Sequence, residues 1–449
     1  MRGRRLWVGL GGALVAASVL LFGGILSGSK ATNPLATAIA SARSGTAQQD
    51  ALTRLLEGFA TGDTAAYVRK LERRIAMHPK DADALTLAGL SYQQRGRETG
   101  DPAFYKLSDE ALQRAANAGG QPALIAQGRA SLANTRHRFH DGLGLAREAI
   151  RLDPENGSAY GALGDALLNL GRYPEAFRAY DKMAVIAPGI ASYSRVANAR
   201  ELTGRSVAAA EAERLALATG STVPEHVAWT TVQLGNVDFN QGRAADAAKE
   251  YREALRRLPG YVHAEAGLAR VDAAEGRYGR AVARLRHVVE VLPIPAYVIL
   301  LGDILHVSGH ETQARRQYAL VGAIERLFAA NGVRTELQAA VFDLDHGRNV
   351  AGALARARTA YDAAPGIYAE DALAWGLFRA GRCGLARSHS SHALRLGTRD
   401  ALLIFHRAMI ERCLGAPSAG EWFRRALATN PHFSFLWAPV ARAAVATGS

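Results

Sequence analysis

Two pairs of histidines are the residues whose type and spacing could carry metal chemistry. His137 and His140 stand three positions apart, and so do His389 and His392. On a helix this spacing brings both imidazoles of a pair to one face. Imidazole is a common metal ligand, but two of them make a weak site without a third. The pairs therefore define an alternative function, an exported ligand-binding or metal-binding, chaperone-like protein; the main prediction contains no metal site.

Motifs for the common enzyme reactions are missing from the sequence. It contains no Gly-x-x-x-x-Gly-Lys phosphate loop, no His-Glu-x-x-His zinc helix and no Gly-x-Ser-x-Gly nucleophile elbow. Gly142 and Gly144 have no preceding strand pattern, so they do not form a dinucleotide fingerprint. The sequence therefore predicts a protein that is not an enzyme and has no cofactor.

The charge balance first suggests a nucleic-acid partner, because 54 Lys and Arg residues against 41 Asp and Glu residues leave a net charge of +13. Many arginines, however, belong to a recurring Gly-Arg pair that is predicted to follow a helix end, where a cation offsets the helix dipole. The excess charge is then spread along the chain instead of forming one patch, and we predict no nucleic-acid partner. The pairs are residues 96–97, 171–172, 204–205, 242–243, 276–277, 347–348 and 381–382.

The N-terminus carries a membrane-targeting pattern in residues 1–26. Arginines at positions 2, 4 and 5 precede Leu6–Leu26, which are 21 residues without a charge. A helix of that length spans ~30 Å, the thickness of the hydrocarbon core. An uncleaved anchor and a cleaved signal both agree with this pattern. In either case the arginines stay in the cytoplasm, and the chain beyond the polar linker 27–50 lies outside it, single-pass or secreted into a periplasm.

An internal repeat organises the rest of the chain. Each unit reads as two helical stretches with apolar residues at helical spacing, and the clearest units add a glycine between the stretches and a closing proline. No single unit can bury its apolar face alone, so neighbouring units must stack. Four pairs of equivalent residues are each 34 positions apart: Gly242 and Gly276, Ala247 and Ala281, Tyr251 and Leu285, Pro259 and Pro293.

This pattern of apolar residues, glycine, alanine, aromatic residue and proline resembles the tetratricopeptide repeat family. The resemblance implies an all-α, right-handed α-solenoid of about eleven helix-turn-helix units over residues 51–431, followed by a capping helix in 432–449. Two irregularities stand out: a polar loop insertion in 97–106 and one longer helix in 310–331. The units are 51–79, 82–118, 121–154, 157–188, 190–220, 228–259, 262–293, 295–325, 335–365, 367–397 and 400–431.

In this family the concave face, formed by the first helix of each unit, binds a peptide or protein. The resemblance therefore implies a non-enzymatic interaction scaffold on the extracytoplasmic side of the membrane, with envelope machinery as a possible class of partner. The aromatic residues of this face either project into the groove or pack against a neighbouring helix. The implied contact residues are Asn198, Trp229, Asn236, Phe239, Asn240, Arg270, His306, Trp375, Phe378 and Arg379, with Asp165, Asn169, Asp303, Tyr368 and Asp371 at equivalent positions.

The only two cysteines, Cys383 and Cys413, fall near the helix-helix turns of neighbouring units. Stacked turns lie along one edge of a solenoid, and an exported protein meets oxidising conditions. We therefore predict a disulfide bond between them, the alternative being two small buried thiols.

Overall fold

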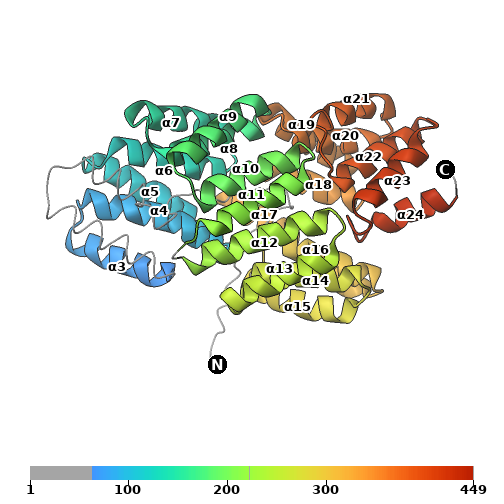
Figure 1. Cartoon of the computed structure of the whole chain (residues 1–449), viewed down its shortest axis with the longest axis horizontal. Coiled ribbons are helices and arrows are strands. Elements are labelled where there is room, and N and C mark those ends of the chain that lie inside the picture. The colour runs from blue at the N-terminus through green and yellow to red at the C-terminus, as the bar shows by residue number, and fades with distance from the viewer. Residues whose placement is uncertain (1–62, 222, 448–449) are drawn as a thin grey trace.

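The computed structural model describes residues 63–221 and 223–447, and every regular element in this part of the chain is an α-helix. Consecutive helices pair as antiparallel hairpins, and the hairpins stack side by side (Figure 1). The first helix of each hairpin lines the inside of the array: α4 Ala82–Thr99, α6 Pro122–Thr135, α8 Gly157–Asn169, α10 Ile190–Leu202, α12 Pro224–Asn240, α14 Val262–Ala274, α16 Pro295–Val307, α18 Glu336–Asp345, α20 Ile367–Arg379 and α22 Ala401–Cys413.

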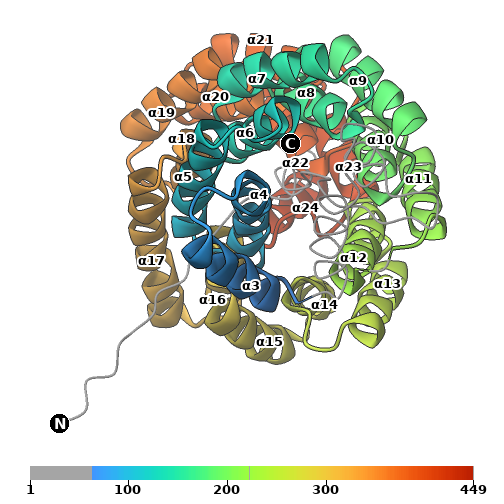
Figure 2. The ribbon, with the colours of Figure 1, turned by 90° about the vertical axis from the view of Figure 1, so that its left-hand side faces the viewer.

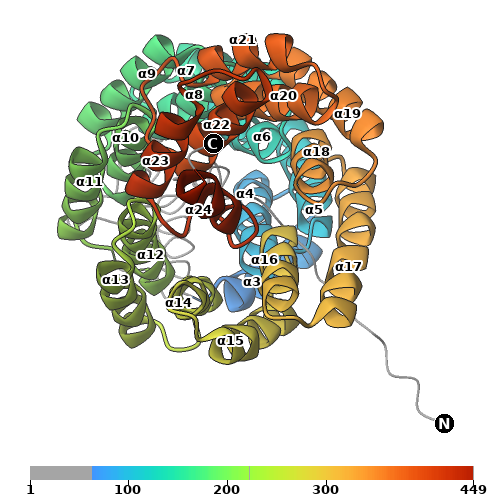
Figure 3. The ribbon, with the colours of Figure 1, turned by 90° about the vertical axis from the view of Figure 1, so that its right-hand side faces the viewer.

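The second helix of each hairpin lies on the outside, as both end views show (Figures 2 and 3). These helices are α5 Ala103–Asn117, α7 Phe139–Leu152, α9 Tyr173–Ile186, α11 Ser206–Ala218, α13 Ala244–Arg257, α15 Tyr278–Val291, α17 Glu311–Ala330, α19 Val350–Ala363, α21 Cys383–Ala393 and α23 Ala419–Thr429. Two helices stand at the ends of the array: α3 Thr64–Met77 before it and α24 Ala438–Ala446 after it.

The hairpin of α8 and α9 shows why this sequence pattern folds as it does. Asn156 caps α8 by accepting a hydrogen bond from the backbone N–H of Ala159. A methyl group added at Gly164 would lie 2.3 Å from the ring of Tyr180, so the glycine allows the aromatic side chain of α9 to reach α8. The small residue and the aromatic residue of the repeat pattern therefore fit together within one hairpin.

Inner and outer helices differ in how much of their surface is covered. Ten of the 13 residues of α20 are buried, against four of the 11 residues of its outer partner α21. Helix α20 contacts its hairpin partner α21, the preceding outer helix α19 and the inner helices α18 and α22, so apolar residues surround most of its axis. An outer helix needs only one apolar stripe. The polar residues that remain on inner helices are therefore exceptions that call for a physical reason.

The array winds into a right-handed superhelix of more than one turn. Seen from the N-terminal end, the helices run clockwise from α5 to α21 while they recede from the viewer (Figure 2). Helix α21 comes to lie at the same angular position as α7 (Figures 2 and 3). The right-handed α-solenoid expected from the resemblance is thus the observed architecture of the described residues.

The second turn of the superhelix packs directly on the first. The Tyr173 hydroxyl accepts a hydrogen bond of 2.7 Å from the backbone N–H of Ile367, and the Asn430 side chain donates to the carbonyl of Phe239 at 3.0 Å. These contacts join residues 194 and 191 positions apart. With units of 34 residues, one turn therefore takes about six units (194/34 ≈ 5.7).

Two irregularities of the repeat have different outcomes. The longer helix expected in 310–331 is confirmed as α17, which has 20 residues. The polar loop insertion expected in 97–106 is wrong, because α4 continues to Thr99 and the chain turns within three residues, with Gly100 in the left-handed conformation. Arg97 therefore lies inside a helix, where it pairs with Glu225 at 3.8 Å, and not beyond a helix end.

The ten complete hairpins from α4 to α23 correspond to ten of the predicted units. Helix α24 corresponds to the predicted capping helix and lies inside the ring of helices at that end (Figure 3). The first helix of the predicted unit 51–79, the anchor segment 1–26 and the linker 27–50 lie outside the described residues. Among the helices of 63–447, none combines the length and the apolar character needed to cross a membrane.

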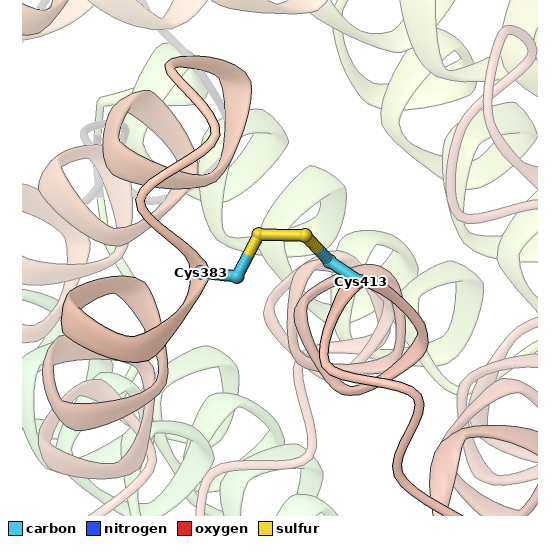
Figure 4. The surroundings of a disulfide bond; sticks show 2 residues. All are labelled: Cys383 and Cys413. Atoms are coloured by element: carbon cyan, nitrogen blue, oxygen red, sulfur yellow. A yellow bond between two sulfur atoms is a disulfide. The ribbon is translucent and has the colours of Figure 1, made fainter.

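Cys383 and Cys413 form a disulfide bond, which is the pairing expected from the sequence (Figure 4). Their Cα atoms are 6.2 Å apart. Cys383 is the first residue of α21 and Cys413 the last residue of α22, so the bond joins two neighbouring hairpins.

Candidate functional site

A cavity of about 290 Å³ lies where the two turns of the superhelix meet on the inner side. The first turn contributes residues of α8, α10, α12 and α14, and the second turn contributes residues of α18, α20 and α22. Apolar side chains form much of its wall, among them Leu168, Leu202, Ile367, Leu402 and Leu403. Its size is at the lower end of the range for small-molecule sites in proteins. Because both turns build it, the cavity exists only in the wound superhelix.

One wall of the cavity carries a hydrogen-bonded polar network across three inner helices. The Arg270 guanidinium donates to the side-chain oxygens of Asn236 at 3.3 Å and Asn240 at 3.4 Å. Asn240 in turn donates to Glu201 at 3.0 Å. The same guanidinium lies 4.0 Å from the centroid of the Phe239 ring, a cation–π contact. The stacking of α10, α12 and α14 thus assembles donors and acceptors on an otherwise apolar surface.

The facing wall carries carboxylates from the second turn. Asp371 on α20 accepts a hydrogen bond of 2.8 Å from Nδ1 of His406 on α22. Its other oxygen, Oδ1, and Nε2 of His406 are buried without a hydrogen-bond partner. Asp400 caps α22 by accepting from the backbone N–H groups of Leu402 and Leu403. Buried polar atoms without partners are rare in proteins and mark a place where a further group could bind.

Burial changes the protonation behaviour of these groups. It raises the pKa of Glu201, and the Asp400 charge adds to that shift. Burial likewise raises the pKa of Asp400, with a further increase from the Asp371 charge. For His406, burial favours the neutral imidazole, but the Asp371 carboxylate outweighs it and raises the pKa above its ordinary value. The carboxylates of the two turns therefore repel one another across the cavity.

The structure brings together four of the predicted contact residues: Asn198, Asn236, Asn240 and Arg270 all line the cavity. Three further inward positions, Asn169, Tyr368 and Asp371, line it as well. Sequence reasoning missed Glu201, Asp400 and His406. Glu201 and His406 do not occupy the repeat positions that were expected to face inward, and Asp400 precedes the start of a helix. The repeat pattern therefore does not identify them.

The aromatic residues of the first superhelical turn pack against neighbouring helices. The expectation that they project into the groove is therefore wrong. Trp229 is 4% exposed and meets the ring of His263 edge-on at 5.3 Å. Phe239 is 2% exposed and lies beneath Arg270. Both rings fill the space between inner helices, where stacking of units leaves a gap for a large side chain.

Among the aromatic residues of the second turn, Trp375 is buried in the same way and Phe378 is partly buried. The Trp375 ring has no exposed surface and stacks between Phe378 at 4.8 Å and His406 at 4.1 Å, and its indole N–H donates to Asp345. The Arg379 guanidinium lies 5.7 Å from the Trp375 ring centroid and donates to the carbonyl of Leu344. Trp375 is therefore not available as an exposed aromatic contact, whereas Phe378 stays partly exposed beside it.

The remaining candidates lie elsewhere. His306 is half-exposed at the end of α16 and pairs with Glu311 at 2.6 Å, away from the cavity. The imidazoles of His389 and His392 both bond the buried carboxylate of Glu370, at 2.8 Å and 2.5 Å. His137 bonds the backbone carbonyl of Arg334 in the second turn at 2.6 Å.

These hydrogen bonds explain His137, His389 and His392 as structural contacts, and His140 is exposed on α7. Within residues 63–221 and 223–447, no group of three His, Cys, Asp or Glu side chains could hold a metal ion. No observation on this part of the chain therefore favours the metal-binding alternative.

Comparison with known proteins identifies the repeat. Residues 125–191 and 239–304 each match a sequence model of the tetratricopeptide repeat. None of the curated proteins compared matches the sequence. Solved structures that it resembles include a tetratricopeptide repeat protein from Parabacteroides merdae, with 14% identity, 55% of this chain and 94% of that chain covered, and a TM-score of 0.38.

Two further structures are similar to the chain. The type IV pilus biogenesis factor PilW has 18% identity, with 45% of this chain and 94% of that chain covered, and a TM-score of 0.37. The human IFIT1 dimer with PPP-AAAA has 12% identity, with 93% and 95% covered, and a TM-score of 0.44. Since the two matched segments lie within a continuous array of helical hairpins, this chain is a tetratricopeptide repeat protein.

Proposed function

We propose that this protein is a non-enzymatic scaffold that binds a segment of a protein partner along the inner surface of its superhelix. The polar network of Arg270, Asn236 and Asn240 is the observation that supports this proposal most directly. Inner helices are covered on most sides by other helices, so hydrogen-bonding groups on their remaining face need a partner or water.

The chemistry of this network suits a polypeptide. Each backbone peptide group offers one N–H donor and one carbonyl acceptor. An asparagine side chain offers both kinds of group, and the arginine offers several donors in a fixed plane. Asn198 adds a fourth side chain to the same wall of the cavity. A segment lying along α10, α12 and α14 would therefore meet groups that match its backbone.

The same proposal places the repeats outside the cytoplasm, held by the N-terminal segment or released after its cleavage. Two observations support this location: the 21 uncharged residues Leu6–Leu26 after three arginines, and the bond between Cys383 and Cys413. Disulfide bonds persist in oxidising compartments and are rare in the cytosol. Reporter fusions after residue 50 would test it, with alkaline phosphatase activity expected and β-galactosidase activity contradicting it.

A photo-crosslinking amino acid at position 198 tests the inner surface. Asn198 lines the cavity from α10, whereas Val207, on the paired outer helix α11, is 70% exposed. We expect a discrete crosslinked partner in the native host from position 198 and none from position 207. The crosslinked peptides, identified by mass spectrometry, should recur when the probe is moved to position 240. A partner captured only from position 207 would contradict binding on the inner face.

A further inference from the structure

The carboxylates on the inner walls of the cavity between the two turns outnumber the cations that contact them. Glu201, Asp371 and Asp400 face it, and among the described residues neither Glu201 nor Asp400 has a cation within ion-pair distance. Counting Arg270 and a protonated His406 as cations, three carboxylates leave a net charge of −1 (−3 + 2). An unpaired charge is costly to bury, so the site is incomplete without a further cation or a bound proton.

The other charged residues that line the cavity do not pair with these three carboxylates. Arg399 lines it, but its side chain is exposed and forms no ion pair with the three carboxylates. Arg334 and Glu336, at the far side, pair with each other at 3.6 Å and cancel. Asp345 lies behind His406, where it adds negative charge.

Unpaired acceptor atoms point to the kind of cation. Oδ1 of Asp371, which is 5% exposed, has no hydrogen-bond partner, and the same holds for Oε1 of Gln338. Both residues line the cavity. An ammonium group carries three N–H donors and no acceptor, so it matches oxygens that lack a donor.

A metal ion fits the site less well. Within the described residues, no three carboxylate or imidazole groups come close enough together to hold a metal ion. The carboxylates instead surround a space whose wall is largely aliphatic, with Leu168, Leu202 and Leu403. Apolar surface of this kind favours a hydrocarbon chain next to the charge. The volume of about 290 Å³ corresponds to roughly ten water molecules at ~30 Å³ each, enough for a short alkyl chain.

We propose that this cavity binds a primary ammonium group carried on a short aliphatic chain, with Asp371, Asp400 and Glu201 as the anionic wall. The lysine side chain of a bound partner segment and a free aliphatic amine share this chemistry. The inference rests on the proposed function only where the ammonium belongs to a partner segment.

Isothermal titration of the full-length protein tests the proposal at neutral pH with two matched probes. n-Hexylamine and n-hexanol carry the same alkyl chain, but only the amine is cationic. We expect the amine to bind at least tenfold more tightly than the alcohol. Equal affinities, or no binding of the amine, would overturn the proposal without the need for any variant.

Single substitutions of the cavity carboxylates then test whether hexylamine binds at this site. Asp371→Asn and Asp400→Asn remove charge but keep the hydrogen-bond acceptor to His406 and the helix cap, since Asn caps a helix as well as Asp. Each should weaken hexylamine binding at least tenfold. Asp181→Asn, an exposed position on α9, is the control and should leave binding unchanged. Equal effects of the control and the cavity variants would contradict the assignment.

The source of the ammonium is distinguished with the peptide Ac-Ala-Leu-Lys-Leu-Ala-amide and its Nε-acetyl-lysine form. Tighter binding of the unmodified peptide than of hexylamine, lost on acetylation, identifies a partner lysine. Tighter binding of hexylamine identifies a free amine. If neither probe binds but crosslinks from position 198 persist, this inference fails and the proposed function stands. If hexylamine binds and the crosslinks are absent, this inference stands and the proposed function fails.

Discussion

At the scale of single residues, the clearest feature is a buried ion pair between neighbouring units. Asp165 on α8 and Arg195 on α10 form two hydrogen bonds of 2.7 Å and 2.9 Å, and both residues are at most 3% exposed. Tyr180 also donates to Asp165 at 3.0 Å. The repeat pattern places Asp165 among the inward-facing contact positions, but its carboxylate is fully engaged within the solenoid.

Arg195→Met should lower the free energy of unfolding by about 3–5 kcal/mol, because Asp165 would remain as an uncompensated buried charge. The matched control is Arg172→Met, which breaks a half-exposed pair with Glu175 and should cost less than ~1 kcal/mol. Urea unfolding measures both. A double variant, Asp165→Leu with Arg195→Met, should recover much of the loss. Similar costs for the two single variants would contradict a structural role of the buried pair.

Glu213 makes stability depend on pH. It is 3% exposed on α11, accepts a hydrogen bond from Ser194, and burial raises its pKa to about 8 from the ordinary 4.5. The folded protein therefore keeps a proton that the unfolded chain releases above pH 4.5. This contribution is complete below pH 4.5 and is lost as the pH rises through 8, at up to ~1.4 kcal/mol per pH unit.

Glu213→Gln should flatten the decline in unfolding free energy between pH 5 and pH 8, since the amide keeps the shape and has no proton to lose. Glu211→Gln, on the exposed side of the same helix, should leave the pH profile of the wild type unchanged. Urea unfolding at several pH values provides the measurement. A profile of the Glu213 variant that parallels the wild type would show that Glu213 is not the responsible group.

At the scale of helices, the disulfide bond reinforces a junction between units. Neighbouring units of a solenoid are held by contacts with their immediate neighbours, so the stability of each junction is largely local. The bond from the start of α21 to the end of α22 closes a loop with a sequence separation of 30.

Breaking this bond with Cys383→Ser and Cys413→Ser together should cost about 3–4 kcal/mol, the loop-closure entropy expected for a loop of this length. Guanidinium unfolding with and without a reducing agent measures the effect. The reducing agent should destabilise the wild type and leave the double variant unchanged. Insensitivity of the wild type to reduction would contradict the prediction.

At the scale of the whole molecule, the second turn of the superhelix holds the first. Loops that join two helices in the first superhelical turn contact loops of the second superhelical turn. Gly171 faces Pro365, Gly204 faces Gly397 and Gly242 faces Pro431. Gly366, Thr398 and Asn430, next to the three second-turn contacts, line the inner cavity. Loosening the contacts between the turns would open the site without altering any residue that lines it.

A comparison of two glycine positions distinguishes the loss of contact between the superhelical turns from ordinary backbone strain. Gly204 and Gly276 both follow an inner helix with positive φ, +73° and +77°. An alanine at either position costs about 1–2 kcal/mol in conformation. Only at Gly204 would the new methyl group meet another segment, the carbonyl oxygen of Gly397 at 2.4 Å.

Gly204→Ala should therefore lower stability more than Gly276→Ala and increase the radius of gyration measured by small-angle X-ray scattering. Gly276→Ala should leave the radius unchanged because nothing lies within 4 Å of its added methyl group. Identical scattering and stability of the two variants would show that contact between the turns does not hold the superhelix closed.

The local features of this protein follow from its sequence alone. A 34-residue period, a glycine after the first helix of most units and the small and aromatic pairs such as Gly164 and Tyr180 predict the hairpins, their order and their stacking. They do so because each unit contacts mainly its neighbours. The neighbouring cysteines are predictable for the same reason, since they lie in adjacent units.

The site depends on contacts that no repeat period encodes. The pitch of the superhelix brings together residues about 194 positions apart, and small rotations between units accumulate to set it. Asp371 and Asn236 are inward-facing in sequence, but only the wound superhelix makes them opposite walls of one cavity. Trp375 has the same inward register and is buried, because the neighbouring unit and the C-terminal segment cover it. Exposure on the inner face is thus decided by the tertiary packing of distant units.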